Sequence, residues 1–268
     1  MLHKAKTLTG YQLDSRDGEM GRVEEFYFDD QRWVVRYLVV DTGSWLTGRR
    51  VLLSPYGLGA VSDVKHQISV NLSKKQIEGS PAMASHKPVS RQLHEIYSGY
   101  YGWPMYWGGP YMWGDRPTLI RDTKEWKDHA RVEGGADPHL RNTAEVTGYT
   151  IEATDGVIGH VEDFVIDDET WAIRYLILDT RTWWAGKKVL ISPKWIDRVS
   201  WGESKVFINL TREIIKASPE FTDESALTHD YEVALHRHYN REGYWTADAA
   251  EGVRFRQRIT SQAASLAR

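Results

Sequence analysis

Apolar residues along this chain gather in short runs that polar turns interrupt, and one such stretch occurs twice. Residues 33–55 read WVVRYLVVDTGSWLTGRRVLLSP, and residues 171–193 read WAIRYLILDTRTWWAGKKVLISP. Each copy starts with a run rich in Val, Ile, Leu and aromatic residues, passes a polar Asp-Thr corner and ends in a second apolar run before Ser-Pro. The pattern predicts a strand, a connection and a second strand in each copy.

The similarity continues on both sides of these stretches at one constant offset. Gly148 corresponds to Gly10, an offset of 138 positions, and the alignment runs without a gap to Pro219 and less closely to Trp245. An internal repeat of this kind indicates two structural units of one type. We predict repeat units at residues 8–107 and 146–245, a connector at 108–145 and a frayed tail at 246–268.

Short strands dominate each predicted unit. Asp17-Gly18 and Asp29-Asp30 are turn signals, and the second copy repeats them. In the first copy the runs typical of strands are residues 10–13, 23–28, 33–40, 51–53 and 68–72. Short antiparallel strands at close spacing favour a small barrel, because closure removes exposed sheet edges. We therefore expect a mostly β protein of two tandem small antiparallel β-barrels with accessory helices, related by an internal duplication.

Helices are expected after the strands of each unit. Ser73 and Gln76 have the spacing of a capping box, and Pro81 ends that helix; Thr211 repeats the cap in the second copy. Apolar residues at helical spacing predict a longer helix next. Its stripe is Val89, Leu93, Ile96, Tyr97 and Tyr100 in the first copy and Leu227, Tyr231, Ala234, Leu235 and His238 in the second.

Composition removes several function classes. The 268 residues include no cysteine, so disulfides, thiolate catalysis and cysteine metal sites are excluded. A formal charge of -3 gives no net positive field for nucleic acid or anionic lipid. No window approaches the roughly 18 apolar residues of a membrane span, and the N-terminus lacks a signal-peptide core. We expect a cytoplasmic protein without nucleic-acid binding or membrane insertion, with peripheral membrane association left open.

Several motifs recur in order in both copies and resemble those of a known family. They are Gly-Tyr, Asp-Gly-x-x-Gly-x-Val, Arg-Tyr-Leu, Asp-Thr and Val-Leu-Leu/Ile-Ser-Pro. This set is similar to the PRC-barrel domain, here in tandem. The family includes the cytoplasmic part of the photosynthetic reaction-centre H subunit and a domain of a ribosome maturation factor. The resemblance implies a small barrel that docks onto a larger partner.

Charged residues that recur in both copies are the first candidates for chemistry. Glu24, Arg36 and Asp41, repeated as Glu162, Arg174 and Asp179, would together form a polar cluster able to transfer protons. The alternative is structural: Arg36 lies on an apolar strand, where a buried cation requires a carboxylate partner. We favour the structural interpretation and assign no catalytic residue.

Histidines and serines give weaker signals. His236 and His238 stand two positions apart, a spacing that a helical metal site disfavours, whereas His229 and His236 share one helical face and leave a weak site open. The first copy has Arg91 and Ser98 at these two positions, so we expect no metal and no cofactor. Ser54-Pro55 and Ser192-Pro193 are turn formers outside a nucleophile elbow. We expect a protein that is not an enzyme.

An aromatic run between residues 100 and 113 is the strongest binding candidate. Gly and Pro interrupt it, so no regular element can bury all its rings on one face. It is either an exposed docking surface or a plug that seals the groove between the barrels, and both interpretations stay open. The candidate partner-binding residues are Trp103, Tyr106, Trp107, Tyr111 and Trp113.

A second aromatic set follows the Asp-Thr corners. We expect Trp45, Trp183 and Trp184 to form the interface between the units, as in an intramolecular pseudo-dimer. The predicted function is a non-catalytic docking or regulatory module for a protein partner, placed by the resemblance at the cytoplasmic face of a membrane. The alternative is a small-molecule or metal-ion sensor, whose inter-barrel cleft would be lined by Arg36, Arg174 and the histidines.

Overall fold

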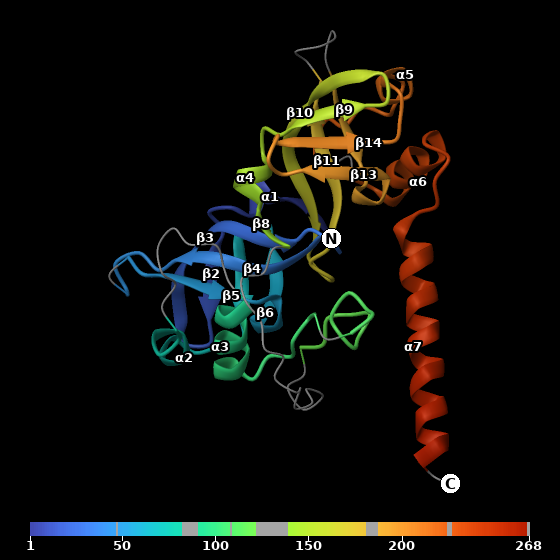
Figure 1. Ribbon diagram of the computed structural model, residues 1–268. Helices are drawn as coiled ribbons and strands as arrows, with labels where there is room; N and C mark the ends of the chain where they lie inside the picture. Colours follow the sequence, from blue (N-terminus) through green and yellow to red (C-terminus); the bar gives the residue numbers. More distant parts are fainter. Residues whose placement is uncertain are drawn as a thin grey trace.

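The computed structural model describes residues 1–46, 48–81, 91–107, 109–121, 139–180, 187–223 and 227–266. Its strands form two mixed sheets with the same strand order, lying one above the other in Figure 1. The first sheet, ordered β5-β4-β3-β2-β7-β6, contains β2 (Gln12–Ser15), β3 (Gly18–Asp29), β4 (Val34–Asp41), β5 (Arg50–Leu53), β6 (Leu58–Ser62) and β7 (Gln67–Val70). The second, ordered β12-β11-β10-β9-β14-β13, contains β9 (Thr150–Ala153), β10 (Gly156–Asp167), β11 (Ile173–Asp179), β12 (Lys188–Ile191), β13 (Ile196–Ser200) and β14 (Lys205–Ile208). We call the parts built on these sheets the first and second units.

Short helices follow the strands of each unit. They are α2 (Lys74–Glu78) and α3 (Arg91–Tyr101) in the first unit, and α5 (Arg212–Lys216), α6 (His229–His238) and α7 (Tyr244–Leu266) in the second. The Ser73–Gln76 capping box is confirmed, and the Thr211 side chain caps α5. Val89 lies outside the described residues. No helix in the described part of the chain has the length and apolar content needed to span a bilayer.

The predicted closed antiparallel barrels are not what the strand pairing shows. β5 and β6 are the two ends of the first path, and β12 and β13 are the ends of the second. β2 also pairs in parallel with β7, and β9 pairs in parallel with β14. The chain passes through β3 to β6 before β7 returns beside β2 in the same direction, so each sheet is mixed.

Glycine is required where β3 bends in the first unit and β10 bends in the second. Gly21 and Gly159 have φ of 145° and 153°, which L side chains rarely adopt. A Cβ on Gly21 would lie 2.2 Å from the carbonyl oxygen of Asp41, and one on Gly159 would lie 2.1 Å from that of Asp179. The second Gly of each Asp-Gly-x-x-Gly motif therefore lets β3 approach β4 closely, and β10 approach β11.

The two units exchange strands at their junction. β1 (Leu2–Lys4) pairs with β10 of the second sheet, and β8 (Leu140–Asn142) pairs with β3 of the first. Leu2 lies opposite Asp167 and Leu140 lies opposite Asp29, so both pairs of residues are related by the offset of 138. Two short helices, α1 (Ala5–Leu8) and α4 (Thr143–Val146), follow the exchanged strands. Part of the expected connector therefore belongs to the folded junction.

Equivalent residues also meet directly at the junction. Val34 forms an isolated bridge with Ala172, its counterpart at the offset of 138. The amide of Val35 donates to the carbonyl of Trp171 (2.8 Å), and the amide of Ile173 donates to that of Trp33 (2.7 Å). β4 is buried from Val34 to Val40 and β11 is buried throughout, so the junction joins the two cores.

The C-terminal segment expected as a tail is helical where the structure describes it. Residues 246–266 continue α7, which extends along one side of the molecule in Figure 1, its C-terminal end away from both sheets. The sequence after Tyr244 is rich in alanine, the best helix former, and lacks proline. These local preferences were present in the sequence and favour the helix that is observed.

Candidate functional site

Two equivalent buried arginines define the most distinctive polar sites of the fold. Arg36 on β4 and Arg174 on β11 are both buried. Each is the extra residue of a β-bulge, since the register shifts between Tyr27 and Phe28 and between Val165 and Ile166. A bulge redirects a side chain away from the regular alternation of a strand.

Each arginine is paired with the aspartate seven residues earlier. The Arg36 Nη2 atom lies 3.0 Å from Asp29 Oδ2, and the Arg174 Nη2 atom lies 2.7 Å from Asp167 Oδ2. A second bond of 3.1 Å joins Arg174 Nε to the same oxygen. These are the carboxylate partners that a buried guanidinium needs.

The structure does not assemble the expected polar cluster. Glu24 pairs with Arg50, and the Asp41 carboxylate accepts a bond from the amide of Gly43 at 2.9 Å. Arg36, redirected by its bulge, pairs with Asp29 and forms no ion pair with Glu24 or Asp41 among the described residues.

The second unit shows the same separation. Glu162 pairs with Lys188 at 2.6 Å, whereas Arg174 pairs with Asp167. Asp179 stands five positions beyond Arg174 at the other end of β11. The proton-transfer grouping of Glu162, Arg174 and Asp179 is therefore not formed either.

Aromatic rings seal the arginine site of the first unit. The Arg36 guanidinium lies 4.1 Å from the ring centroid of Tyr106 and 4.8 Å from that of Trp113. Trp113 also packs edge-on against Tyr56, and its indole nitrogen donates to the carbonyl of Thr170 at 3.1 Å. Arg36 is 0% exposed as a result.

The aromatic run is therefore largely a plug and not an exposed docking surface. Trp103, Tyr106 and Trp113 are buried, and Trp103 stacks on Tyr101 at 4.1 Å between centroids. Trp107 and Tyr111 are half-buried. Of the two open interpretations, the burial favours the one in which the run seals the groove between the units.

The equivalent arginine in the second unit has a different environment. Tyr244, the counterpart of Tyr106, stacks on Arg174, whose guanidinium carbon lies 3.9 Å from the ring centroid. No tryptophan stands at the equivalent of Trp113, because position 251 is a glutamate. Instead, Asp248 of α7 pairs with Arg174 Nη2 at 2.9 Å. Burial lowers the pKa of Arg174, but the charges of Asp167 and Asp248 outweigh it and the pKa is raised.

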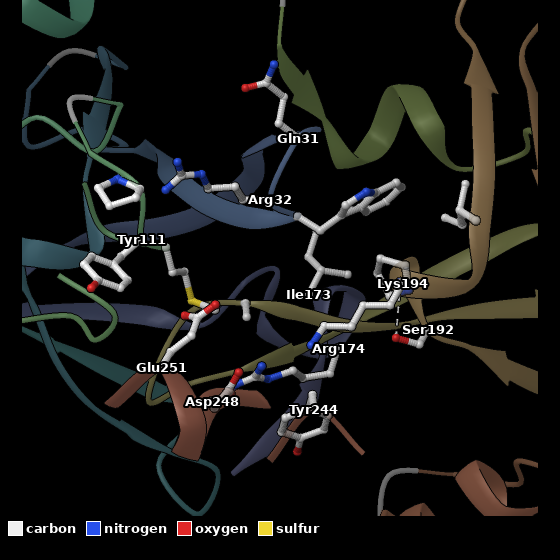
Figure 2. Close-up of a pocket in the computed structure, with 16 residues that line it drawn as sticks. Gln31, Arg32, Tyr111, Ile173, Arg174, Ser192, Lys194, Tyr244, Asp248 and Glu251 are labelled. Atoms are coloured by element: carbon white, nitrogen blue, oxygen red, sulfur yellow. Dashed lines mark hydrogen bonds and ion pairs between the residues drawn. The ribbon is translucent and has the colours of Figure 1, made fainter. Parts of the chain in front are cut away.

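A cavity of about 460 Å³ opens at Arg174, between the two units (Figure 2). Its wall on one side is α7, which contributes residues at positions 244, 248 and 251 on one helical face. The lining residues are Gln31, Arg32, Trp33, Pro110, Tyr111, Met112, Ala172, Ile173, Arg174, Ser192, Pro193, Lys194, Ile196, Tyr244, Asp248 and Glu251. Its volume lies within the range of small-molecule sites.

Three cations and two carboxylates line this cavity. The Nη1 atom of Arg32 is buried and has no hydrogen-bond partner among the described residues, while its Nη2 donates to the carbonyl of Gly109 at 2.8 Å. Burial lowers the pKa of Arg32, and the charge of Arg36 acts in the same direction. Lys194 is exposed and points into the cavity in Figure 2. The lining formally carries one excess positive charge.

The lining of this cavity differs from the lining expected for a cleft between the barrels. Arg174 lines the cavity, but Arg36 is sealed behind Trp113, and the lining contains no histidine. Sequence reasoning missed Arg32, Asp248 and Glu251. A helical reading of residues 244–251 would have placed Asp248 and Glu251 on the face that carries Tyr244.

Of the tryptophans expected at the interface between the units, Trp45 is the one that the structure describes. Trp45 is half-buried and lies under the amino group of Lys74 from its own unit, 5.6 Å from the ring centroid. Trp183 and Trp184 lie outside the described residues. Trp33 and Trp171 are the tryptophans whose backbones join the units.

The histidines of α6 take separate partners. His236 is buried, and its Nε2 atom lies 3.0 Å from the hydroxyl oxygen of Tyr175, whose one proton is donated to Glu232 at 2.9 Å. His229 packs on Trp245, and His238 Nε2 lies 2.8 Å from the carbonyl of Ile214. Among the described residues no three His, Asp or Glu side chains gather as a metal site.

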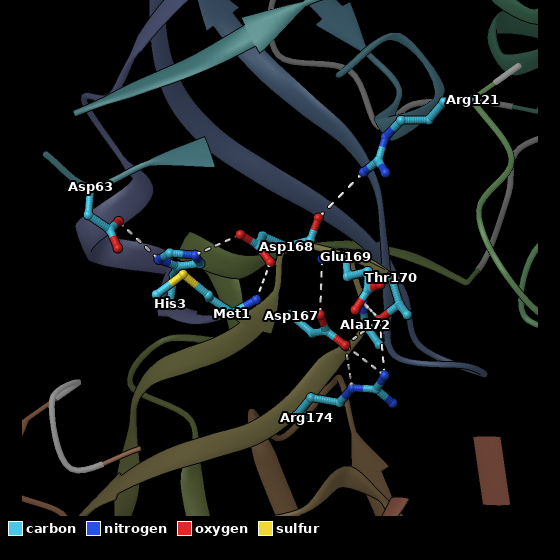
Figure 3. A network of polar contacts seen from close by, with 10 residues as sticks. All are labelled: Met1, His3, Asp63, Arg121, Asp167, Asp168, Glu169, Thr170, Ala172 and Arg174. Atoms are coloured by element: carbon cyan, nitrogen blue, oxygen red, sulfur yellow. Dashed lines mark hydrogen bonds and ion pairs between the residues drawn. The ribbon is translucent and has the colours of Figure 1, made fainter. Parts of the chain in front are cut away.

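A polar clasp holds the exchanged strands (Figure 3). His3 on β1 lies 3.1 Å from Asp168 of the second unit and 3.2 Å from Asp63 of the first. Burial lowers the pKa of His3, but the hydrogen bond to Asp168 and the charges of Asp63 and Asp168 outweigh it and raise the pKa. At the equivalent place in β8, Arg141 pairs with Asp30 at 3.0 Å.

Comparison with protein families identifies one domain. Residues 142–215 match the family model of the PRC-barrel domain, so the second unit contains a PRC-barrel domain. No curated protein matches the chain.

Proposed function

We propose that this protein is a non-catalytic binding module that holds a small molecule in the cavity between its two units. The observation that supports this proposal is the difference between two equivalent arginines. One is sealed by aromatic rings, and the other opens into a cavity of about 460 Å³. A concave site with apolar walls and a few convergent charged groups is typical of ligand recognition.

The proposal includes a tandem arrangement in which residues 8–107 form a second PRC-type unit that arose by duplication. Both sheets share one strand order. Both arginine–aspartate pairs, both exchanged strands and both close glycine approaches are related by the same offset of 138. A ligand between such units would contact both and could therefore report on their relative positions.

A thermal-shift screen of a metabolite collection tests this function. The matched variants are Met112→Trp, which fills the cavity from its wall, and Val64→Trp, at a position that is 95% exposed and does not line the cavity. We expect compounds that raise the melting temperature of the wild type and of Val64→Trp but not of Met112→Trp. A screen without such compounds, or hits that Met112→Trp leaves unchanged, would overturn the proposal.

Protein docking is a second candidate, and exposed apolar residues on α3 support it. Ile96 and Tyr100, one turn apart, are 48% and 44% exposed. A partner at the cytoplasmic face of a membrane, as the H-subunit resemblance implies, belongs to this candidate. Capture by the wild type that Ile96→Asp abolishes and Val64→Asp preserves would support it; capture that is indifferent to Ile96→Asp would count against this surface.

A further inference from the structure

We propose that the cavity takes an apolar molecule carrying a carboxylate, and that this carboxylate displaces Asp248 from Arg174. This inference rests on the proposed function, because it names the ligand class of the same cavity. Asp248 already shows that the open side of the Arg174 guanidinium accepts a carboxylate, at 2.9 Å. A ligand carboxylate would make the same charge-assisted bond.

The first unit indicates that Asp248 is dispensable for holding the arginine. Arg36 is fully buried, yet its one ion-pair partner among the described residues is Asp29. Arg174 has the equivalent Asp167 and also has Asp248, whose side chain is 33% exposed. A buried arginine in this fold therefore needs one carboxylate, and the second can be replaced.

Further cations favour an anionic ligand over a neutral one. Lys194 and Arg174 both point toward the middle of the cavity in Figure 2. The amino group of Lys194 has no hydrogen-bond or ion-pair partner among the described residues, and Arg32 Nη1 is buried without one. Asp248 occupies only Arg174, so a ligand carboxylate would gain a second charged contact at Lys194.

The remaining lining residues determine which kind of group the carboxylate is attached to in the expected ligand. Trp33, Met112, Ile173 and Ile196 supply apolar surface, and Tyr111 and Tyr244 supply rings with a polar edge. Burying apolar area against these walls would add to the affinity that the charged contacts provide. The expected ligand is therefore an aromatic or aliphatic carboxylate.

Displacement of Asp248 would weaken the contact between α7 and the rest of the second unit. Tyr244 and Asp248 hold the first turns of this helix on Arg174. Three turns along, Phe255 contacts Tyr111 at 5.7 Å between ring centroids, and the Arg116 guanidinium lies 5.4 Å from the Phe255 ring. Ligand binding and the resting position of α7 thus compete for one guanidinium.

Isothermal titration calorimetry with three acid and amide pairs tests the proposal. The probes are benzoate and benzamide, 2-naphthoate and 2-naphthamide, and octanoate and octanamide. For at least one body we expect the acid to bind about tenfold more tightly than its amide, as one charge-assisted hydrogen bond provides. Equal affinity within every pair, or no binding by any probe, would overturn the carboxylate assignment.

Variants test whether the ligand carboxylate competes with Asp248 for Arg174 or binds beside it. Asp248→Asn removes the internal competitor, so we expect it to bind the acid several-fold more tightly, whereas Lys194→Gln should bind it several-fold more weakly. The control is Asp230→Asn, an equal charge change at an exposed position on α6. If Asp248→Asn weakens acid binding, Asp248 supports the site and displacement is wrong.

Two results distinguish this inference from the proposed function. Metabolites that stabilise the wild type but not Met112→Trp, combined with no acid preference, would retain the cavity as a binding site and overturn the carboxylate. Tighter binding of 2-naphthyl phosphate than of 2-naphthoate would also overturn it, in favour of phosphate esters.

Discussion

The segments that follow the tyrosines stacked on the two buried arginines are related by the offset of 138 positions but fold differently. The stacked tyrosine is Tyr106 in the first unit and Tyr244 in the second. Residues 108–110 then read Gly-Gly-Pro, whereas residues 246–248 read Thr-Ala-Asp. Proline and glycine disfavour a helix, so the first segment turns back in short bridges while the second continues as α7.

This backbone difference decides what covers each guanidinium. The loop returns Trp113 to the same arginine that Tyr106 contacts. In α7 the equivalent residue, Glu251, stands seven positions after Tyr244, and seven helical residues span about 10 Å. The helix therefore carries position 251 past Arg174 and leaves a cavity there. The different helix propensities of these few residues thus leave Arg36 sealed and Arg174 accessible from the cavity.

The largest expected effect comes from alanine at the equivalent positions 113 and 251. Trp113→Ala removes the ring over Arg36, its packing on Tyr56 and the bond to Thr170, so we expect a loss of about 3–5 kcal/mol in the free energy of unfolding. Glu251→Ala, its counterpart on the cavity wall, should change stability by less than about 0.5 kcal/mol. Urea unfolding measures both, and similar losses of stability would show that positions 113 and 251 have the same structural role.

Substituting the two arginines themselves should give a smaller difference in the free energy of unfolding. Arg36→Met leaves Asp29 buried without its cation, and we expect a loss of about 3 kcal/mol. Arg174→Met should cost about half as much, because Asp167 keeps a bond of 2.7 Å from the Thr170 hydroxyl and Asp248 is free to hydrate. The variants are compared by urea unfolding at one pH. A larger loss for Arg174→Met would contradict the view that its site is open.

Local signals made much of the fold predictable. The apolar run at 33–40 corresponds to β4, the run at 51–53 lies in β5, and the Ser73 capping box starts α2. Each of these depends on neighbours within a few residues. The recurring Gly21 and Gly159 also marked a backbone requirement that the structure explains. The second copy of each signal strengthened it independently.

The features that could not be predicted from the sequence depend on contacts between residues far apart in the chain. The sequence indicates that Arg36 needs a carboxylate, but Asp29 was assigned only to a turn; the β-bulge at Arg36 is what pairs it with Asp29. The exchange of β1 and β8 depends on edges that the other unit provides, and no local pattern encodes it. The cavity was anticipated as a cleft between units, but most of its charged lining depends on α7, which the sequence reading treated as a tail.

The smallest expected difference lies in the clasps, where the first unit's exchanged strand carries His3 and the second carries Arg141. Because the pKa of His3 is raised in the folded protein, its ion pair contributes fully below the unfolded pKa of about 6.5 and is lost as pH rises through the folded value. An arginine in the same place would keep its ion pair across this pH range, because guanidinium groups do not titrate there. Between pH 6 and 8 we expect the wild type to lose about 0.5–1 kcal/mol relative to His3→Arg, which copies the other clasp. Parallel stability profiles for the two proteins would show that this histidine does not make the clasps unequal.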